Sequence, residues 1–194
     1  MHSYMIPTDE GGVGDGQRLV NFCWYINVPD GSAEMHDIFT DRHGKPHGNT
    51  VGQGEVSPAV WERVRAAGTK LMSPPLVELL NKTQEAFVTK VNDVRCPKAR
   101  YLDGRVLIVG DALTTPRSNI ATSIEQAGNH ALWLGQAMRG ESSMADWEKK
   151  VCTLSERLHI LGRVASTAGL ASWFTFLRYV WRYLSFLVRA KWAK

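Results

Sequence analysis

The sequence predicts a mixed α+β fold, and three observations point to it. Two apolar runs rich in β-branched or aromatic residues, 18–28 and 105–109, are typical of strands. Two serine–proline pairs, Ser57-Pro58 and Ser73-Pro74, are typical of helix starts, where the serine caps the helix and the proline occupies its first position. From Ser143 onward the chain has a helical pattern. We therefore expect a mainly antiparallel sheet, one separate strand-loop-helix unit and a helical C-terminus.

The first half of the chain is expected to be built around one strand. The run RLVNFCWYINV, residues 18–28, ends at the turn signal Pro29-Asp30-Gly31. Before it, Glu10–Gly16 has the composition of a loop or hairpin turn, and Tyr4–Ile6 is a further short strand. His36–Gln53 mixes short apolar pairs with Gly, Pro and His, which indicates short strands joined by turns.

Two helices and a further strand should follow. The helix that Ser57 opens is expected to run to about Leu71, and the helix that Ser73 opens to run through Leu80. Phe87–Val91 has the pattern of a strand.

The run RVLIV at 105–109 is apolar after Arg105, which predicts a parallel-type strand buried on both faces. Gly110 ends it. Beyond a loop, Thr122 and Glu125 have the spacing of a capping box, with Thr122 at the N-cap and Glu125 at N3. The helix that follows has Gly140 as its expected C′ residue. Five apolar residues of this helix share one face: Ile124, Ala127, Ala131, Leu134 and Met138.

Composition and charge narrow the function classes. Hydrophobic residues make up 44% and charged residues 22%, which is ordinary for a globular protein. Residues 157–194 hold seven basic residues and no acidic one; since the whole chain carries +4, the first 156 residues carry −3. The basic balance therefore belongs to the tail and does not indicate a nucleic-acid-binding body. Three widely spaced cysteines argue against a disulfide framework and favour a reducing, cytoplasmic compartment.

The segment 103–140 carries the candidate chemistry. Its strand would deliver Gly110 and Asp111 to a C-terminal sheet edge, where ligands bind in open α/β sheets. Glycine lets a ligand approach the backbone, and the aspartate can accept hydrogen bonds from a hydroxylated ligand. The helix N-terminus after the loop offers free N–H groups and a positive dipole end to an anionic or electron-rich group. Three small residues keep that terminus open: Ala121, Thr122 and Ser123.

The series DGRVLIVGDA, a proline-containing loop and a long helix resembles the second FAD motif of the p-hydroxybenzoate-hydroxylase-like flavoprotein monooxygenases. The similarity is greatest to the 2,6-dihydroxypyridine-3-hydroxylase-like branch, through the strand NFCWYINVP, the piece FTDRHG at Phe39–Gly44 and the Pro-Pro helix. It covers roughly Tyr4 to Trp147. Where that branch has an Arg-Pro-His loop, this chain has Arg117-Ser118-Asn119.

The resemblance implies FAD as cofactor, NAD(P)H as its reductant, and hydroxylation of an aromatic or related small molecule with O₂. It implies that Asp111 holds the ribityl hydroxyls and that Gly110 and Ala112 shape the turn. The backbone N–H groups implied to face the flavin ring are those of Ile120, Ala121 and Thr122. No catalytic acid, base or nucleophile is assigned. Taken alone, Asp111 could equally cap the loop after the strand.

Other candidate residues have plainer interpretations. Trp24 and Tyr25 alternate on the strand at 18–28; one should face the core, and the other could line a substrate pocket, since the resembled family holds its substrate on this sheet. Histidines 36, 43 and 47 lie in a stretch broken by Gly and Pro, so we predict no metal site there. His130 is expected to be a surface or half-buried helix residue.

The chain contains no GxGxxG unit that opens a helix, because the glycines at 11, 12, 14 and 16 have the wrong spacing. We expect a truncated, C-terminal part of such a monooxygenase, which alone binds FAD weakly or not at all. Its expected partners are an N-terminal dinucleotide-binding half or a second copy. We predict three segments: the substrate-side sheet and helices in 1–100, the second FAD motif in 101–141 and the C-terminal helices in 142–194.

The C-terminal helical region, expected to be interrupted near Gly162 and Gly169, holds eight of the 18 aromatic residues within Trp173–Trp192. It suits packing on its own domain or on a partner protein, or peripheral contact with a membrane surface. A degenerate, non-catalytic binding domain is therefore the alternative function. One helical face would hold Phe174, Leu177, Trp181, Leu184 and Val188. A narrow basic stripe would hold Arg178, Arg182, Ser185 and Arg189.

Overall fold

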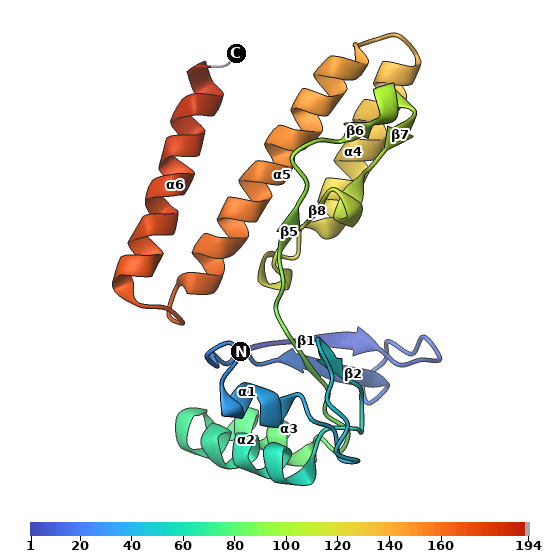
Figure 1. Cartoon of the computed structure of the whole chain (residues 1–194). Helices are drawn as coiled ribbons and strands as arrows, with labels where there is room; N and C mark the ends of the chain where they lie inside the picture. Colours follow the sequence, from blue (N-terminus) through green and yellow to red (C-terminus); the bar gives the residue numbers. More distant parts are fainter. Residues whose placement is uncertain (193–194) are drawn as a thin grey trace. The chain divides into compact units, whose positions relative to one another are not determined.

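The structure is a computed structural model and describes residues 1–192, with the side chain of Trp192 excepted. It is a mixed α+β fold, as predicted (Figure 1). The chain divides into two compact units, Met1–Thr89 and Lys90–Lys194. The prediction of three functional segments is a different division and stays a prediction.

The first unit begins with an antiparallel hairpin. β1 (His2–Pro7) pairs with β2 (Arg18–Cys23), from His2 opposite Cys23 to Pro7 opposite Arg18. The predicted strand at 18–28 is therefore too long, and Trp24 and Tyr25 lie beyond its end. The reason is the extent of the partner strand. β1 begins at His2, which pairs with Cys23, so β1 has no residues opposite Trp24 and Tyr25.

The segment after the hairpin differs in part from the prediction. A helix, α1 (Ala33–Ile38), occupies the beginning of the region expected to hold only short strands. Ser32 Oγ accepts a hydrogen bond from the Met35 N–H at 3.1 Å, an N-cap signal that the sequence interpretation overlooked. The rest of the region does contain short pairings, including β3 (Thr50–Val51) against β4 (Val88–Thr89).

The next two helices begin where the serine–proline pairs predict, although neither Ser57 nor Ser73 makes a side-chain capping hydrogen bond. α2 (Pro58–Leu71) and α3 (Pro74–Lys82) begin at the expected prolines, and α3 extends two residues beyond the predicted Leu80. Helices and short strands of this unit enclose a small apolar core of Phe39, Val51, Val56 and Val60.

The second unit has two short antiparallel pairs. β5 (Val94–Arg95) pairs with β8 (Thr114–Thr115), and β6 (Arg100–Tyr101) pairs with β7 (Val106–Leu107). The predicted strand at 105–109, parallel-type and buried on both faces, is wrong. The 3₁₀ turn η1 (Leu102–Gly104) folds the chain back so that β7 pairs with β6 alone within residues 1–192. Val106 and Val109 consequently stay 41% and 40% exposed.

Three helices complete the second unit: α4 (Ser123–Met138), α5 (Met144–Thr167) and α6 (Trp173–Trp192). Gly140, at a φ of 77°, ends α4, and the Glu141 N–H closes the cap on the Gln136 carbonyl at 3.0 Å. The break near Gly169 is confirmed, but α5 continues through Gly162. α4 and α5 enclose a core of Ala99, Leu113, Trp147 and Val151.

The apolar face predicted for α4 is only partly packed. Leu134 contacts the core, but Ile124 is 90% exposed and Met138 is also largely exposed. The buried side of α4 instead carries Gln126 and His130, both fully buried. These two side chains hydrogen-bond the chain between β7 and α4, which explains why a polar face turns inward.

Candidate functional site

The Gly110-Asp111 turn follows β7 and forms a single 3₁₀ turn, η2 (Gly110–Ala112). Gly110 has a φ of +57°, a left-handed conformation that glycine adopts without steric cost. The Gly110 N–H donates to Nδ1 of His130 at 3.0 Å, and the Gly110 carbonyl accepts from the Leu113 N–H at 3.1 Å. The turn is therefore held from its buried side by a residue of α4.

His130 is fully buried, so the prediction of a surface or half-buried histidine is wrong. Its backbone carbonyl accepts a hydrogen bond from Nε1 of Trp147 on α5 at 3.2 Å. Because Nδ1 is the acceptor for Gly110, the proton of the neutral ring must lie on Nε2. Burial lowers the pKa of His130, which favours this neutral form.

The Asp111 side chain is exposed, and no described residue forms a hydrogen bond or ion pair with its carboxylate. The contact that does hold the loop uses the Asp111 backbone carbonyl, which accepts from Oγ1 of Thr115 at 3.0 Å. The alternative interpretation, in which the carboxylate caps the loop, finds no support in this geometry. The carboxylate is free to accept hydrogen bonds from a ligand.

The loop after the turn is fixed by a partly buried ionic cluster. Arg163 on α5 donates to both oxygens of Asp93, at 2.7 and 2.9 Å, and Arg117 in the loop donates to the same carboxylate at 3.1 Å. The Asp93 side chain is only 8% exposed. Burial alone would raise the pKa of Asp93, but hydrogen bonds and charge from Arg163 and Arg117 outweigh it and hold the pKa below its usual value. One carboxylate thus ties the loop to α5.

Two further contacts fix the same loop. Nε2 of Gln126 donates to the Thr114 carbonyl at 2.7 Å in a buried position. Gly162 lies where α5 passes the loop: a Cβ at this position would lie 3.3 Å from the Arg117 backbone nitrogen. This close approach explains why glycine, which has no Cβ, suits this position of α5.

The start of α4 has no side-chain cap. Thr122 is the N-cap residue, as predicted, but its side chain makes no capping hydrogen bond, so the predicted capping box with Glu125 does not form. Ala121 has a left-handed φ of 49°. Within the described chain, the N–H groups of the first turn have no backbone or side-chain acceptor: Ser123, Ile124 and Glu125.

Two residues predicted to offer free N–H groups are engaged elsewhere. In the 3₁₀ turn η3 (Ser118–Ile120), the Ile120 N–H donates to Arg117 at 3.3 Å and the Ala121 N–H donates to Ser118 at 3.2 Å. The third, the Thr122 N–H, donates to no described residue, so the free donors begin at Thr122. Whether any of these groups contacts a flavin stays a prediction.

The predicted substrate residues lie in the first unit. The Trp24 ring lies near Gly68 of α2, where a Cβ would be 3.4 Å from ring atom Cζ3, and Tyr25 makes an edge contact with His2 at 5.8 Å between ring centroids. Both are half-buried. Their predicted role in binding substrate stays a prediction.

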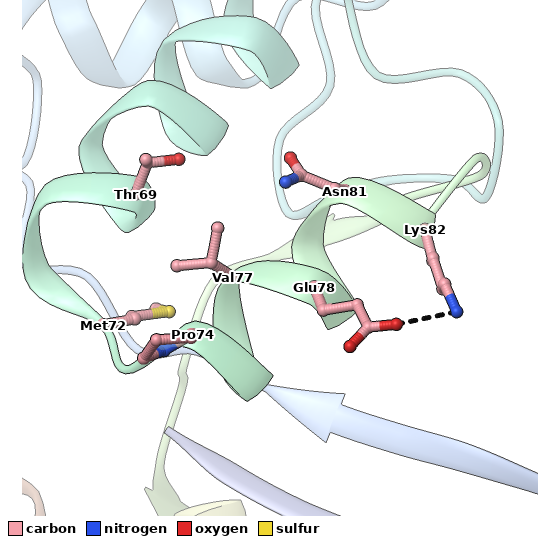
Figure 2. A pocket seen from close by; sticks show the side chains of 7 residues that line it. All are labelled: Thr69, Met72, Pro74, Val77, Glu78, Asn81 and Lys82. Carbon is pink, nitrogen blue, oxygen red and sulfur yellow. Dashed lines mark ion pairs between the residues drawn. The ribbon is translucent and has the colours of Figure 1, made fainter.

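An open pocket lies between α2 and α3 in the same unit (Figure 2), and its volume is about 490 Å³. An ion pair of 2.8 Å between Glu78 and Lys82 borders it. Neither Trp24 nor Tyr25 is among its lining residues, which are Thr69, Met72, Pro74, Val77, Glu78, Asn81 and Lys82. This pocket therefore does not identify a site for the predicted substrate.

Comparison with known proteins finds similarity over most of the chain. Residues 1–93 match a family model described as FAD binding domain-like. The 2,6-dihydroxypyridine 3-monooxygenase of Paenarthrobacter nicotinovorans is 30% identical in an alignment of 154 positions that covers 76% of this chain and 36% of that protein. The structure of 2,6-dihydroxypyridine-3-hydroxylase from Arthrobacter nicotinovorans matches 85% of this chain with a TM-score of 0.71 and 26% identity. The match covers 42% of that structure, so this chain spans less than half of the relatives' length.

Proposed function

The chain is homologous to FAD-dependent monooxygenases, and we propose that it supplies the part of such an enzyme that contacts the ribityl chain and ring of FAD. One observation carries the proposal: the carboxylate of Asp111 is exposed and unpaired, and the anchored loop that follows it leads to the uncapped N-terminus of α4. A carboxylate accepts hydrogen bonds from hydroxyl groups, and a helix N-terminus favours an electron-rich ring edge.

The acceptor and donor groups of this segment match the polar groups of FAD. Asp111 would accept from the ribityl hydroxyls, and the small residues Gly110 and Ala112 would let the ligand approach the backbone. The free N–H groups of Thr122 and Ser123 would donate to the ring edge and stabilise negative charge there. His130 would act as a positioning residue, because it holds Gly110 from behind. When bound, FAD would supply the redox chemistry, with NAD(P)H as reductant and O₂ as oxidant for hydroxylation of an aromatic small molecule.

Further partners belong to the same proposal. Nothing in residues 1–194 is assigned to the ADP end of FAD, and we expect that end to contact a dinucleotide-binding half or a second copy of the chain. Trp24 and Tyr25 remain the proposed contacts for the aromatic substrate.

A flavin titration tests the proposal. The full-length chain would be titrated with riboflavin and with FAD, with and without a GxGxxG-bearing partner protein, and binding followed by flavin fluorescence. D111N should weaken binding about tenfold or more, since hydrogen bonds to charged groups contribute about 1.5–3 kcal/mol. D103N is the matched control, because Asp103 is also exposed and lies outside the turn. The proposal fails if no flavin binds in either setting, or if D111N and D103N bind it equally well.

A further inference from the structure

The helix α6 has two apolar faces, and only one of them is packed. Its inner face lies on α5 through half-buried aromatic residues and Phe186, which is 5% exposed. Its outer face is the one predicted from the sequence, and all five of its residues are between 46% and 80% exposed: Phe174, Leu177, Trp181, Leu184 and Val188. Since α5 already covers the inner face, the outer face is not part of the core of this unit.

A basic stripe follows one edge of the outer face. Arg178, Arg182 and Arg189 stand at helical spacing beside it, and residues 157–194 contain no acidic residue. The guanidinium groups of Arg178 and Arg182 lie over the Tyr179 ring, at 5.4 and 5.9 Å from its centroid. Arg189 has one carboxylate nearby, that of Glu156 at 3.7 Å. The stripe therefore carries excess positive charge next to an exposed apolar surface.

We propose that the outer face of α6 docks on an anionic lipid bilayer, with the helix lying in the plane of the membrane surface. Tryptophan and phenylalanine side chains enter the interface between headgroups and acyl chains, while neighbouring arginines reach the phosphates. From Phe174 to Val188 the apolar face extends about 21 Å, at about 1.5 Å per residue. No helix within residues 1–192 is long and apolar enough to cross a bilayer, so the contact would be peripheral.

Charge favours lipid over a second copy of the chain. If two outer faces packed together, their basic stripes would come close, and α6 has no acidic side chain to neutralise them. An anionic headgroup layer neutralises the whole stripe at once. This proposal is independent of flavin binding, because no residue of the outer face belongs to the turn, the loop or the start of α4.

The test is co-sedimentation of the full-length chain with vesicles. One set consists of phosphatidylcholine alone and the other of phosphatidylcholine with phosphatidylglycerol. The wild type should partition onto the anionic vesicles and be released by high salt. The double variant F174S/W181S should lower the partition coefficient about tenfold or more, and R182Q should lower it about fivefold. The matched controls are L71S, which removes an exposed leucine of α2, and K70Q, which removes an exposed charge of α2.

Size-exclusion chromatography with light scattering shows whether the outer face of α6 is instead an interface between two copies of the chain. If F174S/W181S converts a dimer into a monomer and the wild type does not bind anionic vesicles, the face is a protein interface and the proposal is wrong. Equal binding to both vesicle types, or equal loss in the α2 controls, would also overturn it. Far-UV circular dichroism of each variant checks that α6 is still folded.

Discussion

The backbone N–H of Gly110 donates to Nδ1 of His130 at 3.0 Å, and this bond joins the turn after β7 to the middle of α4. The turn and the start of α4 are the two elements proposed to face the flavin. Because both donor and acceptor are buried, the bond is protected from competition with water. The geometry of the candidate site therefore depends on a side chain that would not touch the cofactor.

Replacing His130 tests this link. H130A should destabilise the second unit by about 2–4 kcal/mol, because it leaves both a cavity and a buried N–H without an acceptor. H130N should cost less, since its side-chain oxygen can take the place of Nδ1 as acceptor. Urea unfolding followed by tryptophan fluorescence measures both. Equal losses would show that packing, rather than the hydrogen bond to Gly110, is what His130 contributes.

The buried histidine also makes stability depend on pH. Burial lowers the pKa of His130 in the folded chain below the usual 6.5. Above pH 6.5 the ring is neutral in both states, so it has no effect. As the pH falls below 6.5 the unfolded chain binds a proton that the folded chain resists, and stability decreases. The unfolding free energy of H130N should decline less steeply than that of the wild type over this range.

The sequence predicted those parts of the fold that local chemistry determines. The starts of α2 and α3, the N-cap at Thr122 and the glycine end of α4 follow from serine, proline, threonine and glycine at fixed local positions. The extents of the strands at 18–28 and 105–109 were wrong because they depend on the length and position of a partner strand. A single sequence does not specify that partner.

The candidate site divides in the same way. The carboxylate of Asp111 is exposed and the first turn of α4 has no side-chain cap, and the predicted contact of both with a flavin stays a prediction. The supporting contacts do not appear in local sequence, because His130 lies 20 residues from Gly110 and Arg163 lies 70 residues from Asp93. The long separations explain why His130 was predicted to be near the surface. The sequence signal that was available is the spacing of Gln126 and His130, which are four residues apart and therefore lie on the same helical face.

Asp93 should be among the most sensitive positions of the second unit. D93N removes the buried charge between Arg163 and Arg117 and should cost about 3–5 kcal/mol, the usual effect of breaking a buried pair. It should also weaken flavin binding, since Arg117 holds the loop. The pKa of Asp93 is lowered, so its contribution exists above pH 3.8 and is lost as the pH falls further. Urea unfolding at several pH values measures this, with D103N as the exposed control.

Asp41 should stabilise the first unit at neutral pH and lose this contribution in acid. Its pKa is lowered to about 2, chiefly by the hydrogen bond from His47 at 2.7 Å and also by the N–H groups of Lys45 and His43. A lowered carboxyl pKa stabilises the fold above pH 3.8 and stops doing so as the pH falls through about 2. D41N should therefore be less stable than the wild type at neutral pH, and the difference should vanish near pH 2. Circular dichroism during denaturant titration follows it; a difference independent of pH would contradict the assignment.

Two helical glycines form a matched pair that tests how closely α5 must approach the loop. A Cβ at Gly128 on α4 meets nothing within 4 Å, whereas one at Gly162 on α5 would lie 3.3 Å from the Arg117 nitrogen and 3.6 Å from Ile120. G128A should stabilise the chain by about 0.8–1 kcal/mol through helix propensity alone. G162A has the same propensity gain but must push the loop away, so we expect a net loss of about 1 kcal/mol or more.

The pair also separates stability from binding. G162A should weaken flavin binding, because Arg117 and Ile120 belong to the loop that leads into α4. G128A changes helix propensity alone and should leave flavin binding unaltered. Thermal unfolding and the flavin titration, run on both variants, give the two readouts. If G162A stabilises the chain as much as G128A and binds flavin normally, the loop tolerates displacement, and its close packing against α5 does not position the site.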